Sequence, residues 1–196
     1  PAVAGCLVSD GRQLVRTDAS GGYSLAAAPV DDVFVVNPSG TWPSGAWWKP
    51  LGAKSPSQSV DFALQKEPQT GPLVFVQGTD IHLRPDVVDL YQQYIAHVNR
   101  LPLPVRFVVH TGDLVVDALA RDLPGARQLF DLYEDQTRSL RFPLRNVIGN
   151  HEHVGIGAPH RHAPVAPYGK AMYLSRLGPT SYAFRWGPYH FLALDG

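Results

Sequence analysis

The sequence contains very little cysteine: among 196 residues, only Cys6 carries a thiol. A single cysteine excludes an internal disulfide, and its place in a short apolar run favours a buried, inert thiol. A zinc site built from thiolates is also disfavoured, because such sites need clustered cysteines. Any metal site in this chain would therefore rely on oxygen and nitrogen ligands.

Long hydrophobic runs and an excess of charge are absent too. No apolar run approaches the roughly 20 residues that cross a bilayer. The 17 basic residues balance 17 acidic ones, the pI is near 7.6, and the arginines are scattered. Composition thus indicates neither nucleic-acid binding nor attraction to an anionic membrane. A hydrophobic content of 44% is ample for the core of one large domain or two small ones.

The chain before residue 68 has the pattern of short strands. Apolar runs alternate with turns, and Asp10-Gly11 between two such runs is a strong hairpin signal. Nothing in this part has helical periodicity, so we expect a small β-sandwich over residues 1–67. Pro68 and Gly71 interrupt regular structure and indicate a linker at 65–71.

Three of the four tryptophans, Trp42, Trp47 and Trp48, lie close together in this first part. They could form an aromatic platform for a sugar or an aromatic ligand. The alternative, which we favour, is that they pack the sandwich against the second domain.

Strand and helix patterns alternate farther along the chain. Runs rich in β-branched residues at 73–76, 105–109 and 146–148 indicate buried parallel strands. Helical periodicity follows Pro85-Asp86 and recurs at 129–133. This alternation predicts an α/β unit with a parallel sheet, in which the loops after the strands gather at one end.

A short polar cluster follows each of these three runs. The clusters are Asp80-Ile81-His82, Gly112-Asp113 and Gly149-Asn150-His151-Glu152. In an extended segment Asp80 and His82 point the same way and can bind one ion, while the two oxygens of Asp113 can bridge two ions. Asn150 can supply an oxygen to the second ion, which leaves His151 free to face a substrate. Mixed Asp, His and Asn ligands suit a first-row divalent ion.

Each cluster also has a purely structural explanation. Asp80 could cap the turn after its strand, and Gly112-Asp113 is a common turn dipeptide. Asp117 is best explained as the cap of a helix that begins near Ala118. The occurrence of all three clusters in this order, each after a strand, favours the metal site.

Several other histidines are candidates with ordinary alternatives. His153, His160 and His162 lie close enough in sequence to approach the site, but histidines are common in surface loops. His110 could orient the bridging carboxylate or simply end a strand. We expect His190 to be a hydrogen-bonded structural residue and His97 to lie on a helix surface.

With these clusters the sequence resembles the calcineurin-like metallophosphoesterase family, which carries D-x-H, then G-D, then G-N-H and an acidic residue. Residues 178–184 and 189–195 also look like the family's paired strands beyond the third motif. By this resemblance Asp80 and His82 bind the first metal, Asp113 bridges, Asn150 binds the second metal, and His151 assists the leaving group. The implied cofactors are two divalent ions, Mn, Fe or Zn. The implied reaction is hydrolysis of a phosphate mono- or diester by a metal-activated water or hydroxide.

The beginning of the chain carries a second resemblance. Residues 17–25 resemble the transthyretin-like or carboxypeptidase-regulatory-like module found at the amino end of some bacterial phosphoesterases. The expected fold is therefore a small all-β sandwich, 1–67, followed by the N-terminal part of an α/β metallophosphoesterase domain, 68–196. We expect an extracytoplasmic or secreted protein, from which a signal peptide could have been trimmed before Pro1.

The chain departs from the family pattern at its end. Family members supply further metal-binding histidines in Gly-His and Gly-His-x-His segments, and neither occurs before Gly196. We expect a fragment, a proteolysed piece or the ordered part of a longer protein, whose second metal keeps only Asp113 and Asn150 here. The alternative function is a non-catalytic cell-surface module that binds glycan and carries a remnant phosphoesterase domain.

Overall fold

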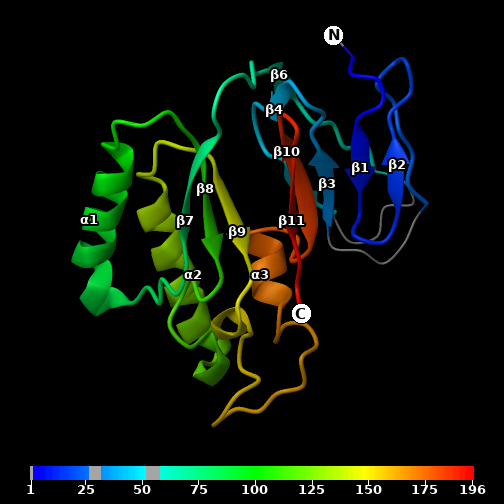
Figure 1. Ribbon diagram of the computed structural model, residues 1–196. Helices are drawn as coiled ribbons and strands as arrows, with labels where there is room; N and C mark the ends of the chain where they lie inside the picture. Colours follow the sequence, from blue (N-terminus) through cyan, green and yellow to red (C-terminus); the bar gives the residue numbers. More distant parts are fainter. Residues whose placement is uncertain (1, 27–31, 52–57) are drawn as a thin grey trace. The chain divides into compact units, whose positions relative to one another are not determined.

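The computed structural model describes residues 2–26, 32–51 and 58–196 (Figure 1). The chain divides into two compact units, Pro1–Gly71 together with Leu177–Gly196, and Pro72–Arg176. None of the described helices is both long enough and apolar enough to span a membrane.

The largest sheet of the first unit is antiparallel and has four strands in the order β2-β1-β3-β5. Its strands are β1 (Leu7–Ser9), β2 (Leu14–Arg16), β3 (Asp32–Val36) and β5 (Trp48–Pro50). The predicted hairpin at Asp10-Gly11 joins β1 and β2: Gly11 has a φ of 82°, and Asp10 Oδ1 accepts hydrogen bonds from two backbone N–H groups beyond it. All five residues of β3 are buried, as expected of a central strand.

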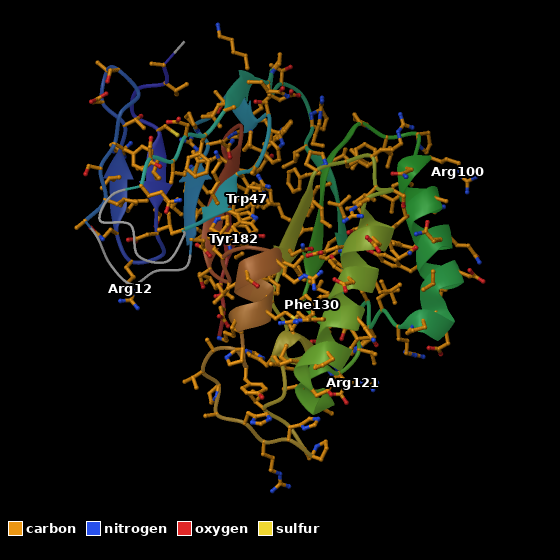
Figure 2. All side chains as sticks on the ribbon, turned by 180° about the vertical axis from the view of Figure 1, so that it is seen from behind. Arg12, Trp47, Arg100, Arg121, Phe130 and Tyr182 are labelled. Carbon is orange, nitrogen blue, oxygen red and sulfur yellow. The ribbon has the colours of Figure 1, made fainter. Side chains whose placement is uncertain are left out.

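Two strand pairs complete the first unit: β4 (Thr41–Pro43) with β6 (Leu64–Lys66), and β10 (Tyr182–Trp186) with β11 (Tyr189–Ala193). Strand β10 lies beside β3 and buries every second side chain. The ring of Trp42 packs edge-on against Trp186, with 5.3 Å between centroids. Trp47 packs against Tyr182 at 4.5 Å (Figure 2).

This aromatic packing bears on the expected domain boundary and on the role of the tryptophans. The strand pair β10-β11, which falls in the expected domain 68–196, lies in the first compact unit, where the aromatic side chains of β10 are buried. Trp42 and Trp47 are only 5% and 8% exposed, so they are core residues and not a platform for a sugar. A closed sandwich confined to residues 1–67 stays a prediction.

The second unit contains the predicted parallel sheet, in the order β7-β8-β9. Its strands are β7 (Val74–Gly78), β8 (Val105–Thr111) and β9 (Leu144–Val147). The crossover helices α1 (Val88–Asn99) and α2 (Leu123–Thr137) contact each other, and Gln92 of α1 hydrogen-bonds Gln136 of α2. Consecutive strand order with right-handed crossovers places both helices on one face of the sheet.

Both helices begin at residues that favour a helix N-terminus. A 3-10 turn, η1 (Pro85–Val87), leads into α1, which buries Tyr91, Ile95 and Val98. The side chain of Asp122 caps α2 by accepting a hydrogen bond of 2.8 Å from the N–H of Gly125. The buried side of α2 includes Leu129, Phe130 and Tyr133, which the sequence pattern indicated.

The three polar clusters follow the carboxyl ends of the three parallel strands. The short turns η2 (Ala118–Ala120) and η3 (Asn150–Glu152) and the helix α3 (Ala171–Arg176) complete the unit. Backbone hydrogen bonds join the first two clusters: the N–H of His82 donates to Asp113 O at 2.8 Å, and the N–H of Leu83 donates to Leu114 O at 3.0 Å. The topology thus brings the clusters to one edge of the sheet, as the sequence predicts.

Candidate metal centre

Three of the predicted ligands have left-handed backbone conformations. The φ angle is 52° at Asp80, 45° at His82 and 51° at Asp113. This region costs an L-residue about 1–2 kcal/mol, although Asp and His enter it more often than most residues. Such residues persist only where neighbouring contacts hold them, and they concentrate at functional sites. Their grouping here is therefore independent support for a site at this sheet edge.

The ring of His82 lies between two carboxylates. Its Nε2 atom is 3.8 Å from Asp80 Oδ1 and 3.8 Å from Asp113 Oδ2. These separations exceed the roughly 3.2 Å of an N–H···O hydrogen bond. Two ligands of one ion, each about 2.0–2.2 Å from it, can lie up to about 4.4 Å apart. Each of these two pairs is therefore close enough to bind one ion, but Asp80 does not join the group of side chains that share metal-ligand spacing.

His151 joins this group from the third cluster. One ligand atom each of His82, Asp113 and His151 lies within 4.8 Å of the others. The rings of His82 and His151 are nearly perpendicular, with centroids 4.5 Å apart. All three residues are partly buried, so they are accessible from solvent but enclosed on one side. The structure thus brings together three of the five predicted site residues: the predicted ligands His82 and Asp113, and His151, which was predicted to face the substrate.

The hydrogen bonds of His151 determine which ring nitrogen carries a proton. Its Nδ1 accepts a hydrogen bond of 2.9 Å from the backbone N–H of Asp117. A neutral imidazole whose Nδ1 is an acceptor carries its proton on Nε2. The backbone N–H of His151 also donates to Asp113 Oδ1 at 3.2 Å. His151 therefore presents an N–H donor, whereas a metal ligand would need a free lone pair.

Asp117 contributes through its backbone, a role that the sequence did not indicate. It occupies the N-cap position of η2, near the predicted helix start, but its side chain makes no capping hydrogen bond. Its φ of 46° is a fourth left-handed conformation in this region, and it directs the N–H toward His151. No sequence pattern could have shown this, because the interaction involves no side-chain atom of Asp117.

Asp80 is the predicted acidic ligand that lies outside this group. Asn150 is exposed at the start of η3, and its backbone carbonyl accepts a hydrogen bond from the N–H of His153. Across the described ranges, one cluster of His, Cys, Asp or Glu side chains has metal-ligand spacing, and it consists of His82, Asp113 and His151. Binding of a second ion by Asp113 and Asn150 stays a prediction.

The other histidines lie outside this group. His160 and His162 stack on each other, and His162 stacks on Tyr168 with 3.8 Å between centroids. His97 is exposed on α1, as predicted, and His190, which we expected to be a hydrogen-bonded structural residue, is exposed on β11.

His110 is fully buried beneath the sheet edge and contacts Tyr94 and Tyr133. Burial lowers the pKa of His110 to about 4. Both ring nitrogens hydrogen-bond tyrosines, which leaves the ring no nitrogen for the predicted contact with the Asp113 carboxylate.

Glu152 is a site residue to which the sequence assigned no role. Its side chain is fully buried, and its carboxylate accepts hydrogen bonds from the backbone N–H groups of Asp113, Leu114, Val115 and Gly149. Burial raises the pKa of Glu152, and the backbone donors act in the opposite direction. This carboxylate is a hydrogen-bond acceptor inside the fold and does not face the metal group.

Comparison with known proteins gives little further information. No protein-family model matches the chain, and no curated protein matches it. A solved structure of a purple acid phosphatase from yellow lupin (Lupinus luteus) seeds is similar over 98% of this chain and 40% of that chain, with 14% identity and a TM-score of 0.40. The chain thus spans 40% of that protein's length. No function is inferred from a similarity of this size.

Proposed function

We propose that the protein is a metal-dependent hydrolase of phosphate mono- or diesters, of the calcineurin-like type that its motifs resemble. The observation that carries the proposal is the convergence of His82, Asp113 and His151 within 4.8 Å at one end of a parallel sheet. In open α/β sheets this end is where ligands bind and chemistry occurs. Nitrogen and carboxylate ligands suit Mn, Fe or Zn.

Asp80, His82 and Asp113 would hold the first ion, and Asp113 with Asn150 the second. Two carboxylates in the first set offset the charge of a divalent cation. The bound ions would supply Lewis acidity toward the phosphoryl oxygens and lower the pKa of a water. The Asp80 side chain is 63% exposed and that of His82 is 32% exposed, so a phosphoester can reach the ligands from solvent.

His151 would act on the leaving group. Its Nδ1 is occupied by the N–H of Asp117, so Nε2–H is the donor that remains for a developing negative charge. A hydrogen bond from this N–H would stabilise the negative charge that develops on the departing oxygen in the transition state. The hydrogen bond from its backbone to Asp113 keeps the donor beside the metal ligands.

The direct test is turnover and metal content of the wild-type protein and Asp113→Asn. With Mn²⁺ we expect release of nitrophenol from p-nitrophenyl phosphate or its diester, loss of activity on chelation, and recovery on adding Mn²⁺ back. Asp113→Asn should lose both metal and turnover, because it removes charge from the proposed bridge. Asp86→Asn is the matched control, since Asp86 is 70% exposed and pairs with Arg84.

Two results would count against the proposal in different ways. Wild-type protein that binds Mn²⁺ but hydrolyses neither ester would contradict the proposed phosphoesterase activity. Asp113→Asn at wild-type occupancy and activity would show that the bridging role is wrong. The glycan-binding alternative has no comparable support, because Trp42 and Trp47 are buried.

A further inference from the structure

We infer that Glu152 is a positioning residue that holds two of the three site loops in the geometry that binds metal. Its Oε1 atom accepts hydrogen bonds from the N–H groups of Leu114 (2.7 Å) and Val115 (3.1 Å). Its Oε2 atom accepts from Asp113 (3.1 Å) and Gly149 (2.7 Å). This inference rests on the proposed metal site and adds a residue that never touches the ion.

The hydrogen-bonding capacity of this carboxylate is fully used inside the protein. A carboxylate offers about four lone-pair positions, and four backbone donors fill them. Hydrogen bonds to a carboxylate are also stronger than those between neutral groups. Glu152 therefore has no free oxygen for a metal or a proton-transfer step, and its contribution is to the position of its neighbours.

The contacts of Glu152 join segments that are far apart in sequence. Asp113 lies 39 residues before Glu152, and its left-handed backbone needs outside support. The Asp113 segment in turn holds the first cluster, because its carbonyl accepts the N–H of His82. On the other side, Glu152 directly follows His151 and binds the N–H of Gly149, where η3 begins. One buried carboxylate thus links the positions of Asp113 and His151.

The close approach of these loops leaves little room for adjustment. A Cβ atom on Gly149 would lie well inside van der Waals contact of the Asp113 amide and carboxylate, and 3.0 Å from Glu152 Oε2. The Asp113 carboxylate therefore lies directly against the Gly149 backbone that Glu152 holds. Loss of this anchor would move the metal ligands relative to one another.

The test is Mn²⁺ binding to Glu152→Gln and Glu152→Asp, measured by calorimetric titration of the whole 196-residue chain. A glutamine side chain at this position cannot satisfy more than two of the four donors, because its amide nitrogen is itself a donor. We expect the dissociation constant of Glu152→Gln to rise roughly 10–100-fold, the usual effect of losing a group that orients metal ligands. Glu152→Asp keeps the carboxylate on a shorter side chain, so its dissociation constant for Mn²⁺ should lie between those of wild type and Glu152→Gln.

Two controls separate positioning from a general loss of stability. Asp10→Asn is the chemical match, since Asp10 is also a buried acid that accepts backbone N–H groups, in a turn of the first unit. Tyr133→Phe removes a buried hydroxyl from the second unit itself. Both should lower the melting temperature and leave Mn²⁺ affinity unchanged. Equal affinity of folded Glu152→Gln and wild type would overturn the inference.

Amide hydrogen exchange provides a readout that needs neither a metal nor a folded variant. In the metal-free wild-type chain, the amides of Asp113, Leu114, Val115 and Gly149 should be protected together. Exchange of these amides at the rate of an unstructured peptide would overturn the inference even if Glu152→Gln fails to fold. Protection without any Mn²⁺ binding by wild type would support the anchor and refute the proposed metal site, so the two failures are distinguishable.

Discussion

At the scale of single residues, hydrogen bonds assign the proton on each of two histidines near the site. His151 accepts at Nδ1 and therefore donates at Nε2. His110 has the opposite arrangement: Tyr133 donates its hydroxyl to Asn146 Oδ1, so Nδ1–H of His110 donates to Tyr133. Its Nε2 is then the acceptor for the hydroxyl of Tyr94. The His151 ring lies beside the ring of His82 in the metal group. The His110 ring belongs to a buried series of hydrogen bonds with Tyr94, Tyr133 and Asn146.

Replacing His151 tests its assignment as a hydrogen-bond donor to the leaving group. His151→Gln should lower turnover by roughly 10²–10⁴ while metal content stays near normal, because Nε2–H acts on the leaving oxygen and not on an ion. The loss should be smaller for p-nitrophenyl phosphate than for an alkyl ester, since nitrophenolate leaves with little protonation. Steady-state rates on both esters with parallel metal analysis provide the check. Loss of the metal would reassign His151 as a ligand.

The buried His110 predicts a dependence of stability on pH. Its pKa is about 4 in the folded protein, against about 6.5 in an unfolded chain. As the pH falls from 6.5 to 4, the unfolded state takes up a proton that the folded state does not, so the free energy of unfolding decreases. Across this pH range the shifted pKa of His110 lowers the free energy of unfolding by up to about 3 kcal/mol.

Urea unfolding of wild type and His110→Gln between pH 7 and 4 measures this contribution. The variant should have the lower free energy of unfolding at pH 7, because it loses the hydrogen bonds of His110 to Tyr94 and Tyr133. The difference in free energy of unfolding between wild type and variant should become smaller as the pH falls. Stability curves that run parallel across this range would contradict a buried neutral His110.

At the scale of elements, the sequence predicts what depends on local pattern. The β-branched runs and Pro85-Asp86 correctly located the parallel strands and the start of α1. The local pattern could not assign β10 to the first unit. Tyr182 packs against Trp47 and Trp186 packs against Trp42, and these partners are far apart in sequence. The left-handed backbone of Asp113 and the anchoring by Glu152 were missed for a similar reason, since both depend on tertiary contacts.

The loop at Gly149 provides a prediction at this scale. Gly149→Ala places a methyl group against the amide and carboxylate of Asp113, so one of the two loops must move. We expect a stability loss of about 1–3 kcal/mol, typical of overpacking, together with weaker Mn²⁺ binding. Gly45→Ala is the control, because a Cβ there meets no atom within 4 Å. Unchanged Mn²⁺ affinity in Gly149→Ala would show that the loop contact does not set the ligand geometry.

At the scale of the whole molecule, the proposed site joins three segments that are separate in sequence. His82, Asp113 and His151 follow three different strands, so their grouping exists only in the folded state. An ion that binds the folded chain and not the unfolded one must raise its stability, by about 2.7 kcal/mol at a free concentration one hundred times the dissociation constant.

The most direct test of this account is Mn²⁺ titration of the chain by calorimetry, with the melting temperature recorded alongside. We predict one firmly bound ion per chain, a higher melting temperature with Mn²⁺ than with chelator, and loss of both effects in His82→Ala. The second predicted site, which lacks histidines, should add at most weak binding. Clearly fewer than one ion per chain, with no change in melting temperature, would contradict the metal centre.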